Sequence, residues 1–415
     1  MITVGIVGGG AAGLFAACQL KRLAVGKDIE VTILEKNQIP GQKLTLTGHG
    51  RCNITNRKDP AELKNGFHEA GNFIYPALKE FTPDNTMEFC ERELGLKLKE
   101  EENNRIFPVC DSAVKVRDTI LTYISDSSKT ITGTAVLDIC KKDVFEISTK
   151  NGDYTFDHLI LSCGGSSFTG TGSAGDSYVL AGRMGHTIVP VRAALAPVAL
   201  DRDSSSFTKE LSGVSVNAKV SLYCDGKMIA TRSGDVLFAD FGLTGPAIME
   251  LSREIPVDIN GKNVFIELDL IPSLTEEQLD QELQNRIADH HDTKISNLLS
   301  DQIPASVAEA ITRRAGTAGA YAQSFTKENR KKLRKELKHL CLVLNEAPVI
   351  DRAYVTRGGV SLKEVDRKTM ESKVVPGLYI IGEALDVDGI SGGYNLQACM
   401  SEAYLAAKSI ISSAQ

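Results

Sequence analysis

The opening of the chain, residues 1–35, constrains the fold more than any other stretch because it has the pattern of a complete β-α-β unit. A short apolar strand over 2–7 runs directly into the sequence GGGAAG at 8–13, which fits G-x-G-x-x-G. A helical pattern follows, and a second apolar strand over 29–34 ends immediately before Glu35. Strand, glycine motif, helix, strand and acid in this order predict a site for an adenine dinucleotide.

The glycines and the acid of this unit each have a physical role. Gly8 permits the tight turn after the strand, Gly10 lets a pyrophosphate approach the backbone, and Gly13 lets the helix pack close to the sheet. The helix N-terminus offers free N–H groups and a positive dipole end to the phosphates. Glu35 can accept hydrogen bonds from both ribose hydroxyls and would repel a 2′-phosphate, which disfavours an NADP-type ligand. The alternative is an ordinary glycine-rich turn between a strand and a helix.

Length and composition are those of a globular protein with two or three domains. The net charge of −6 argues against a nucleic-acid-binding surface, and no run of about 18 apolar residues could span a membrane. The apolar N-terminus lacks the basic region and cleavage site of a signal peptide, so we expect a cytoplasmic protein. The nine cysteines never occur as C-x-x-C, which predicts reduced thiols and excludes a dithiol reductase. Neither the cysteines nor the histidines indicate a metal site.

A second glycine-containing stretch, residues 36–56, has the composition of a loop. Its Lys43 and Arg51 could neutralise a pyrophosphate, and Asn53 could address the polar edge of a ring. A solvated surface loop is the alternative. Cys52, between Arg51 and Asn53, is more simply a small packing residue than a nucleophile.

Residues 60–127 look mostly helical, and 130–156 alternate like a small antiparallel meander. In flavoproteins with two dinucleotide domains such a meander lies near the adenine, which Val136 would then reach. A strand over 158–161 precedes the sequence GTGSAG at 170–175, a second match to G-x-G-x-x-G. This match does not directly follow a strand, and no strand with a terminal acid comes about 20 residues later, so we expect no second nucleotide fold there.

The middle of the chain changes character at Ala193. Short β-type runs separated by Asp-Gly, Ser-Gly and Asn-Gly pairs predict an antiparallel barrel or sandwich inserted into the first domain. A capping box at 275–278 opens a helical segment that lasts to about residue 340. Its last part, 326–340, carries seven Lys/Arg against two Glu, with leucines at helical spacing. A solvated basic face is the simplest interpretation, and a landing patch for a phosphate-bearing partner is the alternative.

The end of the chain has a second glycine-rich turn before a helix. A buried-strand pattern over 375–381 leads to Gly382-Glu383, the glycine-rich stretch 386–397 and a final helix to about Ile411. One dinucleotide does not need two such helix N-termini for its phosphates alone. A flavin does, because reduction places negative charge on one edge of its ring, where a helix N-terminus stabilises it. This pairing changes the expected ligand from NAD to FAD.

Several motifs resemble those of one family from end to end. They are GGGAAGL at 8–14, GQKLTLTGHGRCNITN at 41–56, LSCGGSSFTGTGSAGD at 161–176, FADFGLTGPAI at 238–248 and GGYNLQ at 392–397. On these motifs the chain resembles the BaiN/YhiN-type, aminoacetone-oxidase-like bacterial NAD(P)/FAD-dependent oxidoreductases. The resemblance implies an α/β fold, the FAD-binding Rossmann-like fold of two-dinucleotide-domain flavoproteins, with an inserted β-barrel and a small helical domain. The implied boundaries are 1–192 with 356–415 for the discontinuous FAD-binding domain, 193–271 with 341–355 for the barrel, and 272–340 for the helical domain.

The family's cofactor-binding positions carry over residue by residue. The resemblance implies that the first glycine motif holds the pyrophosphate, that Lys36 and Lys43 lie along the adenosine and diphosphate, and that the tail holds the ribityl chain and ring. Thr47 replaces a usual Ser and Cys163 a usual Ala or Thr, both mild changes. The expected FAD-binding residues are Gly8, Gly10, Ala11, Ala12, Gly13, Glu35, Lys36, Lys43, Thr47, Gly50, Arg51, Cys52, Asn53, Val136, Cys163, Gly164, Gly165, Gly382, Glu383, Gly392, Gly393, Tyr394, Asn395 and Leu396.

We therefore expect a cytoplasmic FAD-dependent oxidoreductase that moves a hydride between the flavin and an organic small molecule, with NADH or NADPH as electron donor. No nucleic-acid or membrane partner is expected. Two alternatives stay open: a flavin-dependent RNA-modifying protein that uses the basic helix, and a flavin-binding sensor without turnover. The residues single out no catalytic acid or base, although His49 and Arg51 fall beside the expected ring.

Overall fold

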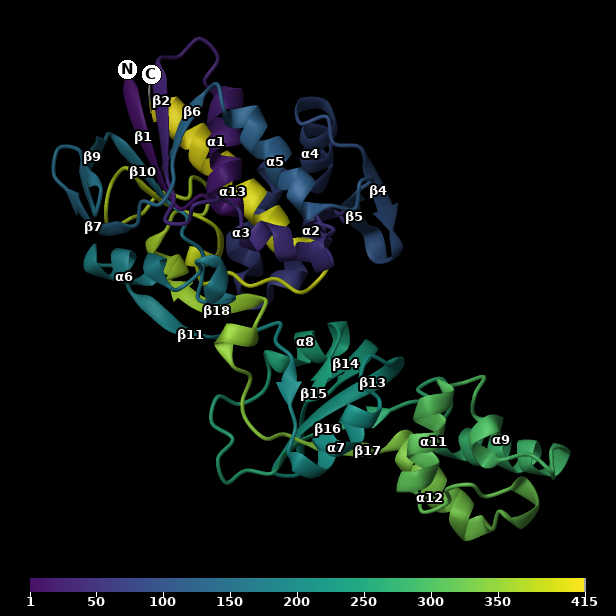
Figure 1. Cartoon of the computed structure of the whole chain (residues 1–415). Helices are drawn as coiled ribbons and strands as arrows, with labels where there is room; N and C mark the ends of the chain where they lie inside the picture. The colour runs from purple at the N-terminus through teal and green to yellow at the C-terminus, as the bar shows by residue number, and fades with distance from the viewer. Residues whose placement is uncertain (414–415) are drawn as a thin grey trace. The chain divides into compact units, whose positions relative to one another are not determined.

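The computed structural model describes residues 1–413 and divides the chain into two compact units. The first unit contains Met1–Arg192 and Tyr354–Gln415, and the second contains Ala193–Ala353 (Figure 1). Both ends of the chain therefore belong to one unit, and the other unit is an insertion. A separate helical domain within the insertion stays a prediction.

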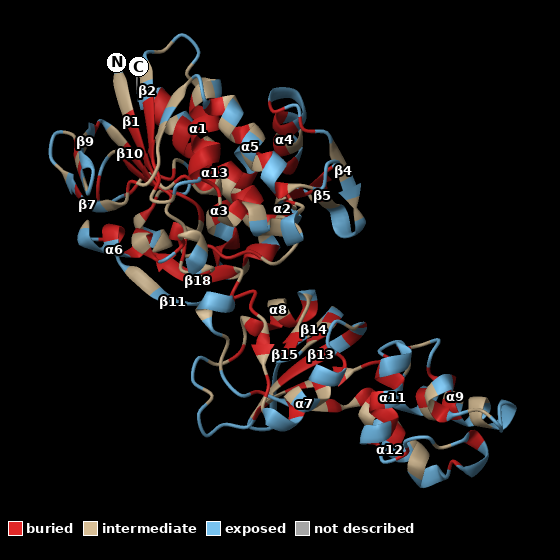
Figure 2. Ribbon diagram, in the orientation of Figure 1, coloured by how far each residue is buried: buried red, intermediate tan, exposed pale blue. Residues whose placement is uncertain are grey.

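The first unit is built on a five-stranded parallel sheet with the order β19-β10-β1-β2-β6. The strands are β1 (Ile2–Val7), β2 (Ile29–Leu34), β6 (Ser128–Ile131), β10 (His158–Leu161) and β19 (Leu378–Ile380). The edge strand β6 is only partly buried, whereas the other four are mostly buried (Figure 2), which explains why those four read as largely apolar runs in the sequence. The last of them comes from the tail of the chain, so the tail completes the sheet that the opening residues begin.

Helices cover this sheet. α1 (Ala11–Leu23) connects β1 to β2 and packs against α13 (Tyr394–Ser413) and α5 (Ala113–Ile124). α13 also contacts α3 (Gly71–Glu80) and buries most of its residues, as expected for a helix enclosed on several sides. Of the antiparallel meander predicted for 130–156, the part from Val136 is confirmed as β7 (Val136–Lys141), β8 (Phe145–Thr149) and β9 (Gly152–Phe156), whereas residues 130–131 belong to the parallel strand β6.

The expectation that residues 60–127 are mostly helical is only partly correct. An antiparallel hairpin interrupts the helices, and Asn103 and Asn104 at its turn have positive φ angles of 61° and 60°. Such angles suit asparagine, and two adjacent asparagines were the available sequence signal. The remaining elements of this region and of the first unit are β3 (Thr55–Asn56), α2 (Pro60–Leu63), α4 (Pro83–Glu88), β4 (Leu98–Glu101), β5 (Arg105–Pro108), α6 (Asp176–Arg183) and β18 (Val355–Val360), and β11 (Ile188–Ala194) leads into the insertion.

The second unit contains the predicted barrel. Six strands pair antiparallel in the order β12-β15-β14-β13-β16-β17. The two ends of this order meet, because Leu200 forms an antiparallel bridge with Leu344 and the Asn345 N–H donates to the Ala199 carbonyl at 3.1 Å. Two runs expected as separate strands are one strand, β14, in which Gly234 continues the chain without a turn. The strands are β12 (Val198–Ala199), β13 (Ser215–Cys224), β14 (Lys227–Ala239), β15 (Gly242–Thr244), β16 (Val264–Asp269) and β17 (Leu340–Val343).

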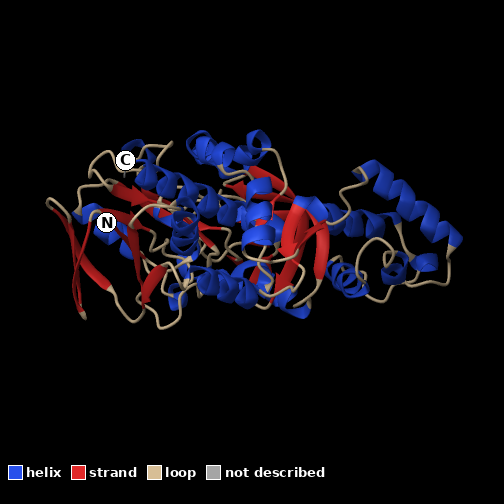
Figure 3. Ribbon diagram, turned by 90° about the horizontal axis from the view of Figure 1, so that it is seen from above, coloured by secondary structure: helices blue, strands red, loops and turns tan. Residues whose placement is uncertain are grey.

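Helices fill the connection between β16 and β17 (Figure 1). Figure 3 shows the helices of the chain in blue and its strands in red. The first helix of this connection begins at the predicted capping box, in which Thr275 and Gln278 each accept a backbone N–H from the other. The helices of this unit are α7 (Arg202–Glu210), α8 (Pro246–Ser252), α9 (Glu276–Asp289), α10 (Ile295–Leu298), α11 (Ala305–Arg314) and α12 (Lys327–Lys338). Across residues 1–413, every helix is too short or too polar to cross a lipid bilayer.

Candidate dinucleotide site

The first glycine turn has the geometry that its sequence predicts. Gly8 has a φ of 101°, which favours glycine, and its N–H donates to the Leu34 carbonyl at 2.9 Å. A Cβ on Gly13 would lie 2.0 Å from the Gly8 carbonyl oxygen, so only glycine allows α1 to start this close to the sheet. A Cβ on Gly10 would meet nothing nearer than the Ser162 carbonyl oxygen at 4.0 Å. The backbone at Gly10 is therefore the part of the turn that a ligand can approach.

The N-terminus of α1 is suited to a diphosphate. Its N-cap residue is Gly10, no side chain caps it, and the first turn contains no acid. The first N–H groups of a helix have no partner within the helix, and their dipoles favour an anion. An uncapped helix end beside an open glycine position is the arrangement that the pyrophosphate of FAD requires, so these residues fit the expected cofactor.

Glu35 is held at the end of β2, next to the glycine turn. Its side chain is buried, Oε2 accepts the Gly9 N–H at 2.7 Å, and Oε1 accepts the Asn37 N–H at 2.7 Å. Each carboxylate oxygen can accept more than one hydrogen bond, so two fixed oxygens remain able to receive ribose hydroxyls.

Lys43 joins three segments that are far apart in the sequence. Its Nζ donates to Glu383 Oε2 at 2.7 Å and to Ser167 Oγ at 2.6 Å. Glu383 also accepts from Ser167 Oγ at 2.8 Å and from the Thr356 N–H at 2.6 Å, and a Cβ on Gly165 would lie 2.7 Å from its Oε1. The expected residues Lys43, Gly165 and Glu383 therefore meet around one carboxylate. Ser167, which lies within the motif at 161–176, and Thr356 belong to the same cluster, although neither was among the expected FAD-binding residues.

The loop from Thr47 to Asn53 divides into inward and outward parts. Arg51 forms ion pairs with Glu101 and Asp111 and lies 4.2 Å from the centre of the Phe107 ring. Hydrogen bonds to both carboxylates raise the pKa of Arg51. The positive charge of Arg51 is therefore paired with acids of the β4–β5 region. A role of Arg51 on the pyrophosphate stays a prediction that its surroundings do not favour.

The other expected residues of this loop, Thr47, Gly50 and Cys52, stabilise its conformation. The Thr47 hydroxyl donates to the Leu44 carbonyl at 2.7 Å, and Gly50 has a φ of 83°. Burial raises the pKa of the Cys52 thiol to about 12.

The tail of the chain packs against the opening segments. A Cβ on Gly393 would lie 2.4 Å from the carbonyl carbon of Thr55, and one on Gly382 would lie 2.7 Å from Cβ of Ala12. In the amide orientation that satisfies all its neighbours, Asn53 accepts the Gly393 N–H at 3.1 Å. Within the first unit, the tail therefore lies against the first glycine motif at Ala12 and against the segment around Asn53 and Thr55, as a single FAD held between these segments would require.

The remaining expected residues are placed as follows. Asn395 closes the tail turn by accepting the Gly389 N–H at 2.8 Å and donating to the Gly389 carbonyl at 2.9 Å. Cys163 and Gly164 follow β10, and burial raises the pKa of the Cys163 thiol to about 12. Lys36 pairs with Asp176 at 2.5 Å, Val136 begins β7 and packs on the core, and Gly392, Tyr394 and Leu396 border the start of α13.

Glu402 is a buried carboxyl beneath this region that sequence reasoning missed. It lies fully buried on α13, its Oε2 accepts the Gly382 N–H at 2.5 Å, and its Oε1 has no partner. Burial raises the pKa of Glu402 from 4.5 to about 8. The carboxyl thus positions the backbone of Gly382, next to Glu383.

This carboxyl predicts a pH-dependent stability. Between pH 4.5 and about 8 the folded protein keeps the proton on Glu402 and the unfolded chain loses it, so the free energy of unfolding should fall as the pH rises through this window. Glu402→Gln should remove that part of the slope, whereas Glu62→Gln on the surface should keep it. Urea unfolding at pH 5.5 and 8 measures both. Equal slopes in the wild type and the Glu402→Gln variant would contradict a buried, protonated Glu402.

The parallel sheet, the open glycine turn and the acid after β2 define a Rossmann-type dinucleotide-binding protein. Comparison with known families agrees, since the model of the HI0933-like protein Rossmann domain matches residues 2–409. The chain belongs to this HI0933-like family, which confirms the resemblance found in the sequence. Family and fold together point to FAD as the cofactor and to an oxidoreductase, as predicted.

Characterised relatives share the whole length of the chain. It is 32% identical over 413 residues to a 3-dehydro-bile acid delta(4,6)-reductase of Clostridium scindens, with 98% of each chain covered. It is 31% identical to a ribosomal RNA dihydrouridine synthase of Haemophilus influenzae, with 98% of this chain and 97% of the relative covered. Among solved structures, a 3-ketosteroid delta1-dehydrogenase of Sterolibacterium denitrificans shares the fold with a TM-score of 0.55 at 14% identity, each chain being covered in full.

Proposed function

We propose that this protein is an FAD-dependent reductase of a carbon–carbon double bond that is conjugated with a carbonyl group, and that NADH or NADPH is the electron donor. When bound, FAD supplies the site from which a hydride is delivered. The observation that carries the proposal is the close approach of the tail to the opening segments, Gly382 to Ala12 and Gly393 to Thr55, because one cofactor bound by both parts of the chain would need them close together.

The names of the relatives support this reaction class. In a 3-dehydro-bile acid that carries double bonds at positions 4 and 6, these are conjugated with the 3-carbonyl, and in uridine the 5,6 double bond is conjugated with the 4-carbonyl. Reduction of either adds a hydride to a carbon remote from the carbonyl and a proton to its neighbour. The two relatives therefore differ in substrate and agree in chemistry, and the shared chemistry is what we assign to this chain.

The chain's own residues would bind and orient the reactants. The α1 N-terminus and Gly10 would receive the diphosphate, and Glu35 would accept the ribose hydroxyls. The cluster of Lys43 and Glu383 would fix the loop and the tail on either side of the cofactor.

A second candidate, an RNA substrate, is favoured by the surface of α12. Lys327, Lys331 and Lys335 lie at i, i+4 and i+8, are exposed, and have no acidic partner among residues 1–413. Lys332, on another face of the helix, is also exposed without an acidic partner in the described chain, whereas Arg330 and Arg334 pair with Asp280 and Lys338 pairs with Asp269. A stripe of three unpaired lysines suits a phosphate backbone, although the net charge of −6 opposes one.

The test begins with the purified holoprotein under anaerobic conditions. We expect NADH or NADPH to bleach its absorbance near 450 nm, and a 4-en-3-one steroid or ribosomal RNA to restore it. With RNA as substrate, the triple variant K327E/K331E/K335E should lower turnover about tenfold or more and leave turnover of any small enone unchanged. A reduced protein that neither substrate class reoxidises faster than buffer would contradict the proposed reaction.

A further inference from the structure

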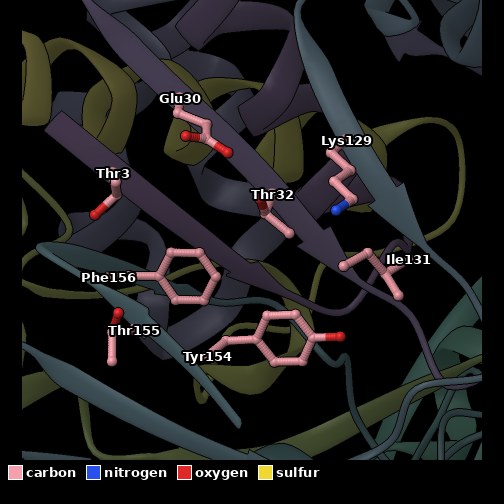
Figure 4. A pocket seen from close by; sticks show the side chains of 8 residues that line it. All are labelled: Thr3, Glu30, Thr32, Lys129, Ile131, Tyr154, Thr155 and Phe156. Atoms are coloured by element: carbon pink, nitrogen blue, oxygen red, sulfur yellow. The ribbon is translucent and has the colours of Figure 1, made fainter. Parts of the chain in front are cut away.

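A pocket of about 200 Å³ lies in the first unit, away from the dinucleotide site (Figure 4). Thr3, Glu30 and Lys129 contribute to its lining, and each is the second residue of its strand, β1, β2 or β6. These strands are parallel, and the glycine turn follows the other end of β1. The pocket is therefore near the N-terminal ends of the strands, whereas the dinucleotide residues are at the C-terminal ends.

Strand register explains how this pocket forms. Thr32 lies two residues after Glu30 on the same face of β2 and is directly opposite Lys129 on β6. Its neighbour on β1 is Gly5, where a Cβ would lie 2.4 Å from the Phe156 ring. Because Gly5 has no side chain, the Phe156 ring can lie directly against the sheet. This ring is stacked with that of Tyr154, with centroids 6.5 Å apart and planes within 3° of parallel. Two parallel aromatic rings thus border the pocket.

Polar groups in this pocket lack partners. Thr32 is only 6% exposed, and its hydroxyl makes no hydrogen bond with any described residue. The Glu30 carboxylate, the Lys129 ammonium and the Tyr154 hydroxyl likewise have no hydrogen bond or ion pair within residues 1–413. Thr3 differs, because the Asp157 carboxylate accepts both its N–H and its hydroxyl at 2.8 Å. Glu30 and Lys129 are exposed, and the Thr32 hydroxyl lines the pocket, so all these groups can be reached by a ligand that enters it.

We propose that this pocket is a second small-ligand site, one that takes a planar heterocycle of nucleobase size. The aromatic rings suit a flat molecule. The Glu30 carboxylate can accept a hydrogen bond from the ligand, and Lys129 and Thr32 can donate hydrogen bonds to it. The opposite charges of Glu30 and Lys129 favour a ligand with no net charge. Figure 4 shows Glu30 and Lys129 on either side of Thr32, so the donor and the acceptor belong on different edges of the ring. An aromatic amino acid, whose two charged groups share one carbon, matches this less well.

The test uses holoprotein saturated with FAD, so that the dinucleotide site is filled. Adenine, uracil and cytosine are titrated by calorimetry and by saturation-transfer NMR, with phenylalanine and tyrosine as competitors of the other class. We expect saturable binding of at least one nucleobase. Thr32→Val, which keeps the shape and removes the hydroxyl, and Lys129→Gln should each weaken it at least fivefold. Lys150→Gln, an exposed lysine on the turn between β8 and β9, should leave it unchanged.

Three results would overturn the proposal. They are no saturable binding of any nucleobase, equal affinity in Thr32→Val and Lys129→Gln to that of the wild type, or tighter binding of phenylalanine or tyrosine than of every base. Lys129 is on the surface, so Lys129→Gln tests the pocket even where Thr32→Val does not fold. The titration uses protein that is already loaded with FAD and measures binding, not turnover. Failure to bind a nucleobase is therefore distinguishable from failure of the proposed reductase reaction.

Discussion

Gly10→Glu should give a folded protein that no longer retains FAD. The φ and ψ of Gly10 are −78° and −171°, which any residue adopts, and a Cβ there has 4.0 Å of free space. The negative charge of a glutamate at this position is compatible with the helix, because it lies next to the positive end of the α1 dipole. The same carboxylate would take the place of the diphosphate and repel it. We expect FAD affinity to fall about 100-fold or more.

The matched control is Gly182→Glu. Gly182 is exposed on α6, and the nearest atom to its Cβ would be Cγ1 of Ile188 at 3.8 Å. This variant adds the same charge and should keep its FAD. Absorbance near 450 nm, fluorescence titration with FAD and far-ultraviolet circular dichroism compare the three proteins. A yellow Gly10→Glu protein with wild-type FAD affinity would show that the α1 N-terminus does not bind the diphosphate.

The opening turn could be predicted from the sequence because its determinants are local. Gly8, Gly10, Gly13 and Glu35 lie in one β-α-β unit, and each acts through backbone conformation or through its place at a strand end. The barrel could be predicted for a related reason, since short alternating strands with Gly-containing turns leave a regular pattern. The order of its strands and its closure through Leu200 and Leu344 depend on pairing between distant residues and left no such pattern.

Contacts between distant segments are what the sequence did not reveal. Arg51 was an expected ligand residue, but its carboxylate partners lie in a region that looked helical, Glu101 at the end of β4 and Asp111 just after β5. Glu402 interrupts the apolar stripe of α13, yet only the fold shows that the backbone N–H of Gly382 is its partner. A charged residue at a core position of a helix is a usable signal for such a group, because burial of an unpaired charge is costly.

Gly393→Ala should be among the most damaging single substitutions in the first unit. Gly393 has a φ of 96°, and a Cβ would lie 2.4 to 2.8 Å from three backbone atoms of Thr55, which cannot rotate away as a side chain can. The Gly393 N–H is also the donor to Asn53. A methyl group would therefore push the tail away from the segment around Asn53. We expect a loss of about 3 kcal/mol or more in the free energy of unfolding, and weaker FAD binding with it.

Gly95→Ala separates backbone strain from this clash. Gly95 also has a positive φ, 67°, but a Cβ there would meet no atom within 4 Å, so its replacement should cost about 1 kcal/mol and spare FAD binding. Urea unfolding and FAD titration of both variants measure the difference. It reports how much the protein depends on contact between the tail and the opening segments, because the two glycines differ mainly in what faces them. Equal losses in the two variants would mean that the tail does not need to touch Thr55, and the account of one cofactor held between two glycine turns would then fail.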